Sequence, residues 1–298
     1  MKPSQAKGYL FVIASAVIYG CMPLMASAIY ANGVNSVTLV FLRNILSLPA
    51  LGILARMQNK SMAIPKKALP SIGLVALSGC CITPLLLFSA YKHIASGTAT
   101  VLHFIYPAAV VVAGVVFLHQ KAGTKNIVSV ALCIGGLCMF YTPGQSLNPL
   151  GSALALMSGL TFAGYILLLS NFKYKQVSGF LLNFYIASVS SVFMLIVCLA
   201  TNSLALPQSI GAWALCLFFA TIVTAGASVL FQQGTFIVGG EKASVLSALE
   251  PITGVVVGAL FLNETVTLRA AIGSALIIAA SILISLKEKT NEKAKGDL

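Results

Sequence analysis

The chain has 298 residues, of which 58% are hydrophobic and only 8% are charged, and its formal net charge is +12. Soluble domains carry about 25% charged residues, so this composition excludes a soluble globular protein. The basic residues fall in short clusters between apolar runs, as in the cytoplasmic loops of membrane proteins, and this pattern excludes nucleic-acid binding. No Asp, Glu, Lys or Arg occurs in residues 126–172 or 176–240. The sequence therefore predicts an all-α polytopic membrane protein.

Ten apolar segments of membrane-spanning length follow one another along the chain. The first ends in Ala-Ser-Ala at residues 26–28, which is typical of signal-peptidase sites, so a cleaved signal peptide is the alternative to a first helix. The length of the segment and a counterpart later in the chain favour a retained helix. The predicted transmembrane helices span residues 8–29, 35–56, 68–91, 97–118, 126–141, 150–170, 179–200, 210–237, 243–262 and 266–286.

The distribution of Lys and Arg predicts the orientation of these helices. With the N-terminus inside, 15 of the 18 basic residues lie in cytoplasmic segments, whereas Lys92 and Arg269 lie outside and Arg43 lies within a helix. The opposite orientation would invert this ratio, so both termini are predicted to be cytoplasmic. The expected location is the cell (inner) membrane, with a charged cytoplasmic tail at residues 287–298.

The chain contains an internal repeat. Residues 96–137 align without a gap to residues 240–281 at a shift of 144, and 12 of the 42 positions are identical, including Pro107 and Pro251. Each half therefore holds five predicted helices, at 1–145 and 146–286. Because five is odd, the second half is predicted to be inverted relative to the first, an arrangement typical of transporters.

Sparse polar side chains occur at similar depths in the predicted helices. Placing the charged side chain of Glu250 at mid-membrane would cost about 2.5 kcal/mol or more of insertion free energy, unless the side chain faced a partner or a water-filled cavity. At 1.5 Å per residue, Arg43 and His103 also lie within several ångströms of the midplane. We therefore expect a central cavity with Pro84, Pro107 and Pro251 as hinges. The predicted cavity residues are Glu250, His103, Tyr106, Ser247, Tyr19, Phe162, Tyr165 and Arg43.

Structural explanations of the same residues stay open. Glu250 could bind a substrate amine or carry a coupling proton, but Glu250 and Arg43 could equally form a buried structural pair. The aromatic residues could pack rather than line a cavity, and the prolines could make simple kinks.

Two sequence stretches carry a resemblance to a known family. Residues 243–273, with Pro251, Glu264 and Gly273, and residues 99–121, with Pro107, share one pattern, and Arg43 lies in FLRNILSLPAL. The chain resembles the EamA-type members of the drug/metabolite transporter superfamily, which are ten-helix, two-repeat exporters. Gln120 stands where that family usually has Glu, so a symmetric role of the two loop carboxylates is not implied. The resemblance implies export of amino acids or related amphiphilic compounds.

The predicted function is therefore secondary transport of a small metabolite by alternating access, with protons as a candidate coupling ion. An uncoupled facilitator or channel is the alternative. The chain has no P-loop, HExxH or GxSxG motif, so an enzyme is not expected. The expected partners are a small-molecule substrate, the lipid bilayer and protons, and a homodimer is left open. No cofactor is expected, and the seven cysteines show no metal-binding spacing, so no metal site is expected.

Overall fold

The computed structural model of the protein describes residues 5–59, 61–94, 96–118, 123–139, 148–174, 177–261 and 267–285. Within these ranges all regular secondary structure is helical, and seven helical runs are long and apolar enough to cross a membrane. Two shorter apolar helices are Thr124–Met139 and Leu268–Leu283. The chain is therefore an all-helical membrane protein, as its composition predicts. Gln120, Glu264, the tail and the boundary between the predicted halves lie outside the described residues.

The helices follow the apolar segments, but six of the ten predicted segments are divided within the described residues. The α-helices are α1 (Gln5–Gly20), α2 (Met22–Ala31), α3 (Ser36–Ile45), α4 (Leu48–Gln58), α5 (Leu69–Val75), α6 (Thr83–Ala90), α7 (Ser96–His103), α8 (Tyr106–Leu118), α9 (Thr124–Met139), α10 (Pro149–Ser170), α11 (Gly179–Ala200), α12 (Ile210–Phe219), α13 (Ser228–Val238), α14 (Gly240–Leu246), α15 (Leu249–Phe261) and α16 (Leu268–Ser285). A 3-10 turn, η1 (Lys66–Ala68), precedes α5, and two π-helical segments, η2 (Ala76–Ile82) and η3 (Ala220–Ala227), lie within longer runs.

Proline explains where most of these divisions fall. Pro23, Pro49, Pro84, Pro107 and Pro251 each lie among the first three residues of the helix that follows a division. Proline lacks the N–H that would bond to the carbonyl four residues earlier, and its ring clashes with that carbonyl. It is tolerated in the first turn of a helix, where N–H groups have no partner anyway. Each proline therefore ends one helix and begins the next.

Polar caps define several of the other helix starts. The side chains of Asn35, Ser178 and Ser209 each accept a backbone N–H three residues later, and Asn148 accepts two N–H groups at the start of α10. These bonds satisfy donors that the first turn leaves free. The boundaries of α10 and α11 consequently lie within one residue of those predicted from hydropathy.

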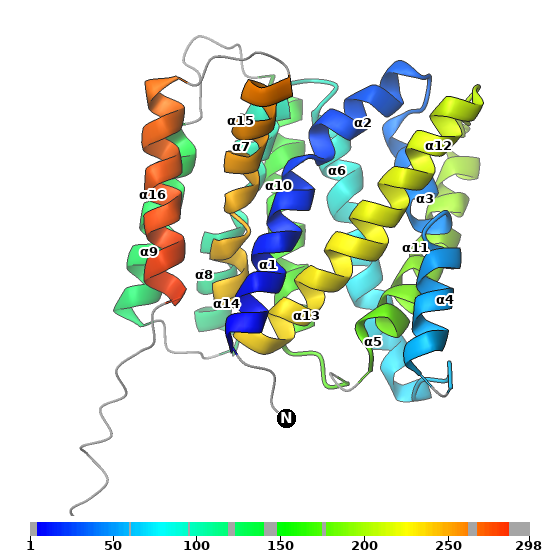
Figure 1. Cartoon of the computed structure of the whole chain (residues 1–298), viewed down its shortest axis with the longest axis horizontal. Helices are drawn as coiled ribbons and strands as arrows, with labels where there is room; N and C mark the ends of the chain where they lie inside the picture. The colour runs from blue at the N-terminus through cyan, green and yellow to red at the C-terminus, as the bar shows by residue number, and fades with distance from the viewer. Residues whose placement is uncertain are drawn as a thin grey trace, which may run out of the picture.

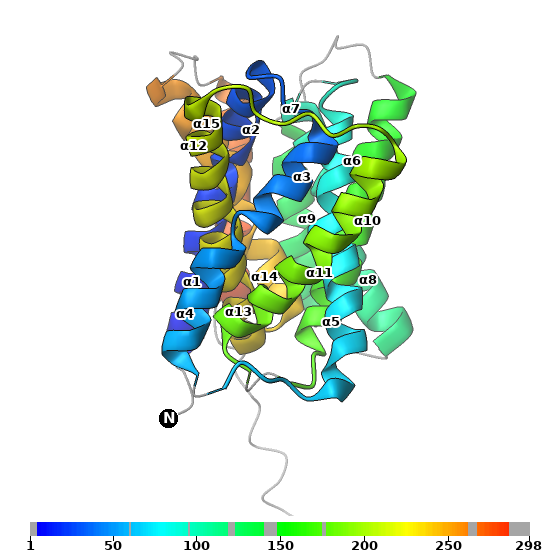
Figure 2. The ribbon, with the colours of Figure 1, turned by 90° about the vertical axis from the view of Figure 1, so that its right-hand side faces the viewer.

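The helices form one bundle with two distinct edges (Figure 1). At one edge α9 packs along α16, and at the other α11 packs against α3 and α4 (Figure 2). Between the edges, α1 packs against α13 and α15, and α10 packs against α6, α7 and α8. In Figure 1, α1 begins at the lower face of the bundle, and α2 extends to the upper face.

The two halves of the chain share irregularities of the backbone. The π-helical segments η2 and η3 begin at Ala76 and Ala220, which are 144 residues apart. In Figure 1, α5 lies below α6, whereas α12 lies above α13, so these two runs cross the bundle in opposite senses. The runs α7–α8 and α14–α15 are also opposed, because α7 and α15 lie at the upper face.

Glycines allow the divided helices to approach their neighbours closely. A Cβ atom at Gly20 of α1 would lie 2.6 Å from the carbonyl oxygen of Glu250 on α15. A Cβ atom at Gly159 of α10 would overlap the carbonyl oxygen of His103 on α7. Small residues let membrane helices pack with their backbones in contact. These two contacts fix the backbone positions of Glu250 and His103.

Candidate functional site

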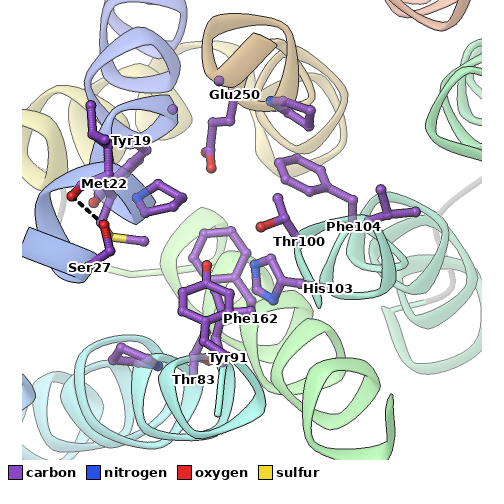
Figure 3. Close-up of a pocket in the computed structure, with 18 of the residues that line it drawn as sticks. Tyr19, Met22, Ser27, Thr83, Tyr91, Thr100, His103, Phe104, Phe162 and Glu250 are labelled. Atoms are coloured by element: carbon purple, nitrogen blue, oxygen red, sulfur yellow. Dashed lines mark hydrogen bonds between the residues drawn. The ribbon is translucent and has the colours of Figure 1, made fainter. Parts of the chain in front are cut away.

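A cavity of about 650 Å³ lies among the central helices. A volume of this size accommodates a small organic molecule. The lining comes from the end of α1, from α2, α3, η2, α6, α7, α10 and α15 (Figure 3). Because α2, α6, α7 and α15 occupy the upper part of Figure 1, the cavity lies toward the face opposite the N-terminus.

Glu250 is the second residue of α15, and its carboxylate is directed into the cavity (Figure 3). Pro251 cannot donate to the carbonyl of Ser247, which instead accepts the N–H of Glu250 at 2.9 Å. Glu250 thus lies in the first turn of a half-helix, where free N–H groups and the helix dipole favour a negative charge. Among the described residues, no hydrogen bond or ion pair engages this side chain. Its carboxylate is therefore available to a ligand.

Arg43 lies on α3 and is buried, with 5% of its surface exposed. Its Nε donates to Oγ1 of Thr224 on η3 at 3.2 Å, and the side chain lines the same cavity as Glu250. No carboxylate lies within ion-pair distance of Arg43 in the described part of the chain. The direct Glu250–Arg43 pair considered from sequence is thus not formed. A carboxyl group and a guanidinium group thus share one cavity without bonding to each other.

His103 is the last residue of α7, just before the division that precedes Pro107. Its Nδ1 lies 2.8 Å from Oγ of Ser158 on α10. Its ring lies 5.4 Å from the ring of Phe162 and 5.3 Å from that of Tyr106. The ring forms a wall of the cavity across from Glu250 (Figure 3).

Aromatic rings form much of the remaining wall. Tyr19, Phe104 and Phe162 line the cavity, and the Tyr19 hydroxyl lies 2.8 Å from Oγ of Ser228. Phe162 stacks on Tyr165 at a centroid distance of 5.4 Å. Such walls suit an apolar or cationic ligand group.

The other predicted residues divide between the wall and the layer behind it. Pro84 and Pro251 line the cavity, whereas Pro107 does not border it. Tyr106, Ser247 and Tyr165 also do not border it and are buried behind the lining. The Tyr165 ring packs directly over Gly79 of η2, where a Cβ atom would overlap it. These residues support the cavity rather than face it.

Several lining residues were not predicted from the sequence. They include Met22, Ser27, Tyr30, Thr83, Tyr91, Thr100 and Phe104. Tyr30 and Tyr91 lie near the ends of predicted helices, outside the mid-membrane layer in which polar groups were sought. In the sequence, these residues could have been recognised as aromatic or hydroxyl side chains near the outer ends of predicted helices. Those helices also contain a proline near the middle of the membrane.

Replacing Pro251 with alanine is expected to lower substrate flux in proteoliposomes about tenfold, with little loss of thermal stability. Alanine restores a backbone donor for the carbonyl of Ser247, so the division before α15 closes and Glu250 turns away from its present direction. A tenfold effect corresponds to about 1.4 kcal/mol. Pro70→Ala is the matched control, since Pro70 follows the short 3-10 turn η1 at the start of α5 and does not divide one α-helix from another. Equal flux in both variants would show that the division does not orient Glu250.

The fold and the cavity together define a class, a polytopic membrane protein with a mid-bundle cavity lined by ionisable side chains. The EamA-like transporter family model matches residues 6–142 and 149–286, so the chain belongs to the EamA-like transporter family. This match confirms the resemblance seen in the sequence, and it indicates a membrane transporter rather than an enzyme.

Individual relatives agree with this assignment. An "Uncharacterized transporter" of Archaeoglobus fulgidus is 28% identical over 58% of this chain and 61% of its own length. The "Uncharacterized inner membrane transporter YicL" of Salmonella typhimurium is 24% identical over 98% of this chain and 99% of its own length. A solved structure described as "Crystal structure of protein" has a TM-score of 0.73 at 14% identity, covering 94% of this chain and 96% of that one. That structural likeness shows a shared fold.

Proposed function

We propose that the protein is a secondary transporter that exports an amino acid or a related amphiphilic metabolite across the inner membrane by alternating access, with protons as the coupling ion. The observation that carries the proposal is that Glu250 and Arg43 line one cavity without pairing with each other. Buried charges are costly without partners, and a ligand with an ammonium and a carboxylate group would supply both. The aromatic wall beside them suits an apolar side chain.

We further propose ten membrane spans arranged as two inverted repeats of five. The 144-residue spacing of η2 and η3 supports this arrangement, as do the opposed directions of α5–α6 and α12–α13. The packing supports it too: α1 of the first half packs on α15 of the second, and α10 of the second half packs on α7 and α8 of the first. In an inverted-repeat transporter, each half contributes divided helices to a site between the halves.

The excess of basic residues in the predicted inner loops favours cytoplasmic termini. With that orientation the cavity lies toward the outer face, opposite the N-terminus (Figure 1). Alternating access then requires the upper halves of the divided helices to close and the lower halves to open. The prolines at the divisions allow such bending, since they interrupt the helical hydrogen bonds at mid-span. The name of the Salmonella relative, an inner membrane transporter, favours an inner-membrane location.

The direct test is a flux screen of the purified protein in proteoliposomes, with labelled amino acids and with or without an imposed pH gradient. We expect uptake of at least one amphiphilic amino acid above that of protein-free liposomes, and accumulation against its gradient only when the pH gradient is present. Downhill flux that ignores the pH gradient would indicate an uncoupled facilitator instead. Absence of flux for every amino acid tested would contradict the proposed substrate class.

A further inference from the structure

The hydroxyl of Ser158 determines which nitrogen of His103 carries a proton. Ser158 Oγ donates to the carbonyl oxygen of Ala155 at 2.6 Å. A serine hydroxyl has a single proton, and here that proton lies on the bond to Ala155. The bond of 2.8 Å between Ser158 Oγ and His103 Nδ1 must then be donated by the imidazole. His103 is therefore protonated at Nδ1.

The second ring nitrogen of His103 is consequently a hydrogen-bond acceptor. The imidazole is in contact with the rings of Phe104, Tyr106 and Phe162, and no carboxylate bonds to it among the residues described. In such surroundings the neutral ring is the less costly form. A neutral ring with a proton on Nδ1 has a lone pair on Nε2. Nε2 has no protein partner among the described residues, and the ring lines the cavity.

Two acceptors therefore face one region of the cavity. The carboxylate of Glu250 points into it from α15, and the imidazole of His103 lies across from it on α7 (Figure 3). A primary ammonium group offers three N–H donors, enough for both acceptors, whereas a quaternary ammonium offers none. The surrounding aromatic rings attract any cation, methylated or not. The acceptors, not the rings, discriminate between these ligands.

We propose that Ser158 is a positioning residue that holds His103 as an acceptor, so that the cavity selects ligands with a primary or secondary amine over tertiary and quaternary ones. The proposal rests on the proposed function, since it deepens the recognition of the substrate amine. It adds a specificity determinant that does not itself touch the ligand. Ser158 is fully buried on α10, does not line the cavity, and its hydroxyl bonds to the lining residue His103.

The test uses full-length protein in nanodiscs and four probes, phenylalanine and its N-methyl, N,N-dimethyl and N,N,N-trimethyl derivatives, with affinity measured by calorimetry. The first two probes keep at least two N–H donors and should bind alike. The third should bind about tenfold more weakly and the fourth about a hundredfold, since each lost bond to a buried acceptor costs about a factor of ten. Affinity that is constant or rises with methylation overturns the proposal.

Ser158→Ala removes the acceptor for the Nδ1 proton and frees the imidazole to protonate at Nε2. The ratio of the phenylalanine and trimethyl-phenylalanine affinities should fall about tenfold. Ser15→Ala is the matched control. Ser15 is a buried serine of α1, 143 residues earlier, whose hydroxyl has no hydrogen-bond partner in the described structure. The ratio should not change in Ser15→Ala, and an equal change in both variants overturns the role of Ser158.

Nuclear magnetic resonance of 15N-histidine-labelled protein reports the tautomer without any ligand. The chain has three histidines, so the His103 signal is assigned by its loss in His103→Phe. We expect the proton on Nδ1 in the native chain and a shift toward Nε2 in Ser158→Ala. A proton on Nε2 in the native chain overturns the inference but leaves the proposed function intact. Failure of all four probes to bind overturns the ligand selection together with the proposed substrate class.

Discussion

Glu250→Gln is expected to abolish accumulation driven by a pH gradient and to weaken amine binding about a hundredfold. Glutamine keeps the shape of the side chain but carries no charge and takes up no proton. Truncating one member of a buried charged pair, here Glu250 and the ligand amine, costs about 2–5 kcal/mol of binding free energy. A hundredfold loss of affinity corresponds to about 2.7 kcal/mol, which is in the lower part of that range. The structure supports so large an effect, because the carboxylate points into the cavity and no protein group satisfies it among the described residues.

Glu241→Gln is the matched control for this variant. Glu241 lies on α14, in the same run of chain, and accepts a hydrogen bond from Asn126 on α9 rather than lining the cavity. Flux and coupling in Glu241→Gln should match those of the native protein. If Glu250→Gln accumulates substrate as well as this control does, Glu250 takes no part in coupling. If only coupling is lost and downhill flux persists, Glu250 carries the proton but does not hold the substrate.

The fold class could be predicted because hydropathy and proline act locally. The charge-free stretches predict membrane helices, and helix ends such as those of α10 and α11 fall within a residue of the predicted positions. The π-helical segments η2 and η3 could not be predicted in this way, because their apolar residues suit an α-helix equally well. The ring of Tyr165 on α10 packs over Gly79 of η2, and a local sequence pattern does not indicate such a long-range contact.

The candidate site could be predicted only in part, because depth along a helix gives the height of a residue but not its direction. Depth along the predicted helices placed Glu250, His103 and Arg43 in one layer of the membrane, and in the structure all three line one cavity. Depth also selected Tyr106 and Ser247, which are buried and do not border the cavity. The helices are interrupted at residues 104–105 and 247–248. Residues before and after each interruption do not share one helical face, so a regular helical spacing does not predict their direction.

The divided helices also explain how polar side chains can be accommodated near the middle of the membrane. Glu250 lies at the N-terminal end of α15, where the helix dipole favours an anion, and the neutral ring of His103 lies at the C-terminal end of α7. Half-helix ends that meet in mid-membrane are a recurring way to build transporter sites. One proline on each run, Pro107 and Pro251, therefore creates a helix end beside a polar side chain.

Arg43→Met is expected to weaken phenylalanine binding about a hundredfold and to leave phenethylamine binding unchanged or slightly tighter. Phenethylamine has the same ring and amine but no carboxylate, so it makes no use of the cation. Methionine fills the space of the arginine stem without charge, and replacing a buried ion by an apolar side chain is often tolerated. Calorimetry with both ligands on the same preparation measures the two effects.

Two further variants separate binding by Arg43 from a structural role. Arg43→Lys keeps the charge but loses the planar fork that matches a carboxylate, so an intermediate loss of about tenfold is expected for phenylalanine. Thr224→Val removes the hydroxyl that accepts from Nε at 3.2 Å but leaves the cation in place, and it should weaken binding less than Arg43→Met does. Equal weakening of phenylalanine and phenethylamine in Arg43→Met would instead mean that Arg43 supports the packing of α3 against η3. The preference for the ligand with a carboxylate, and not the loss of affinity alone, distinguishes the two roles.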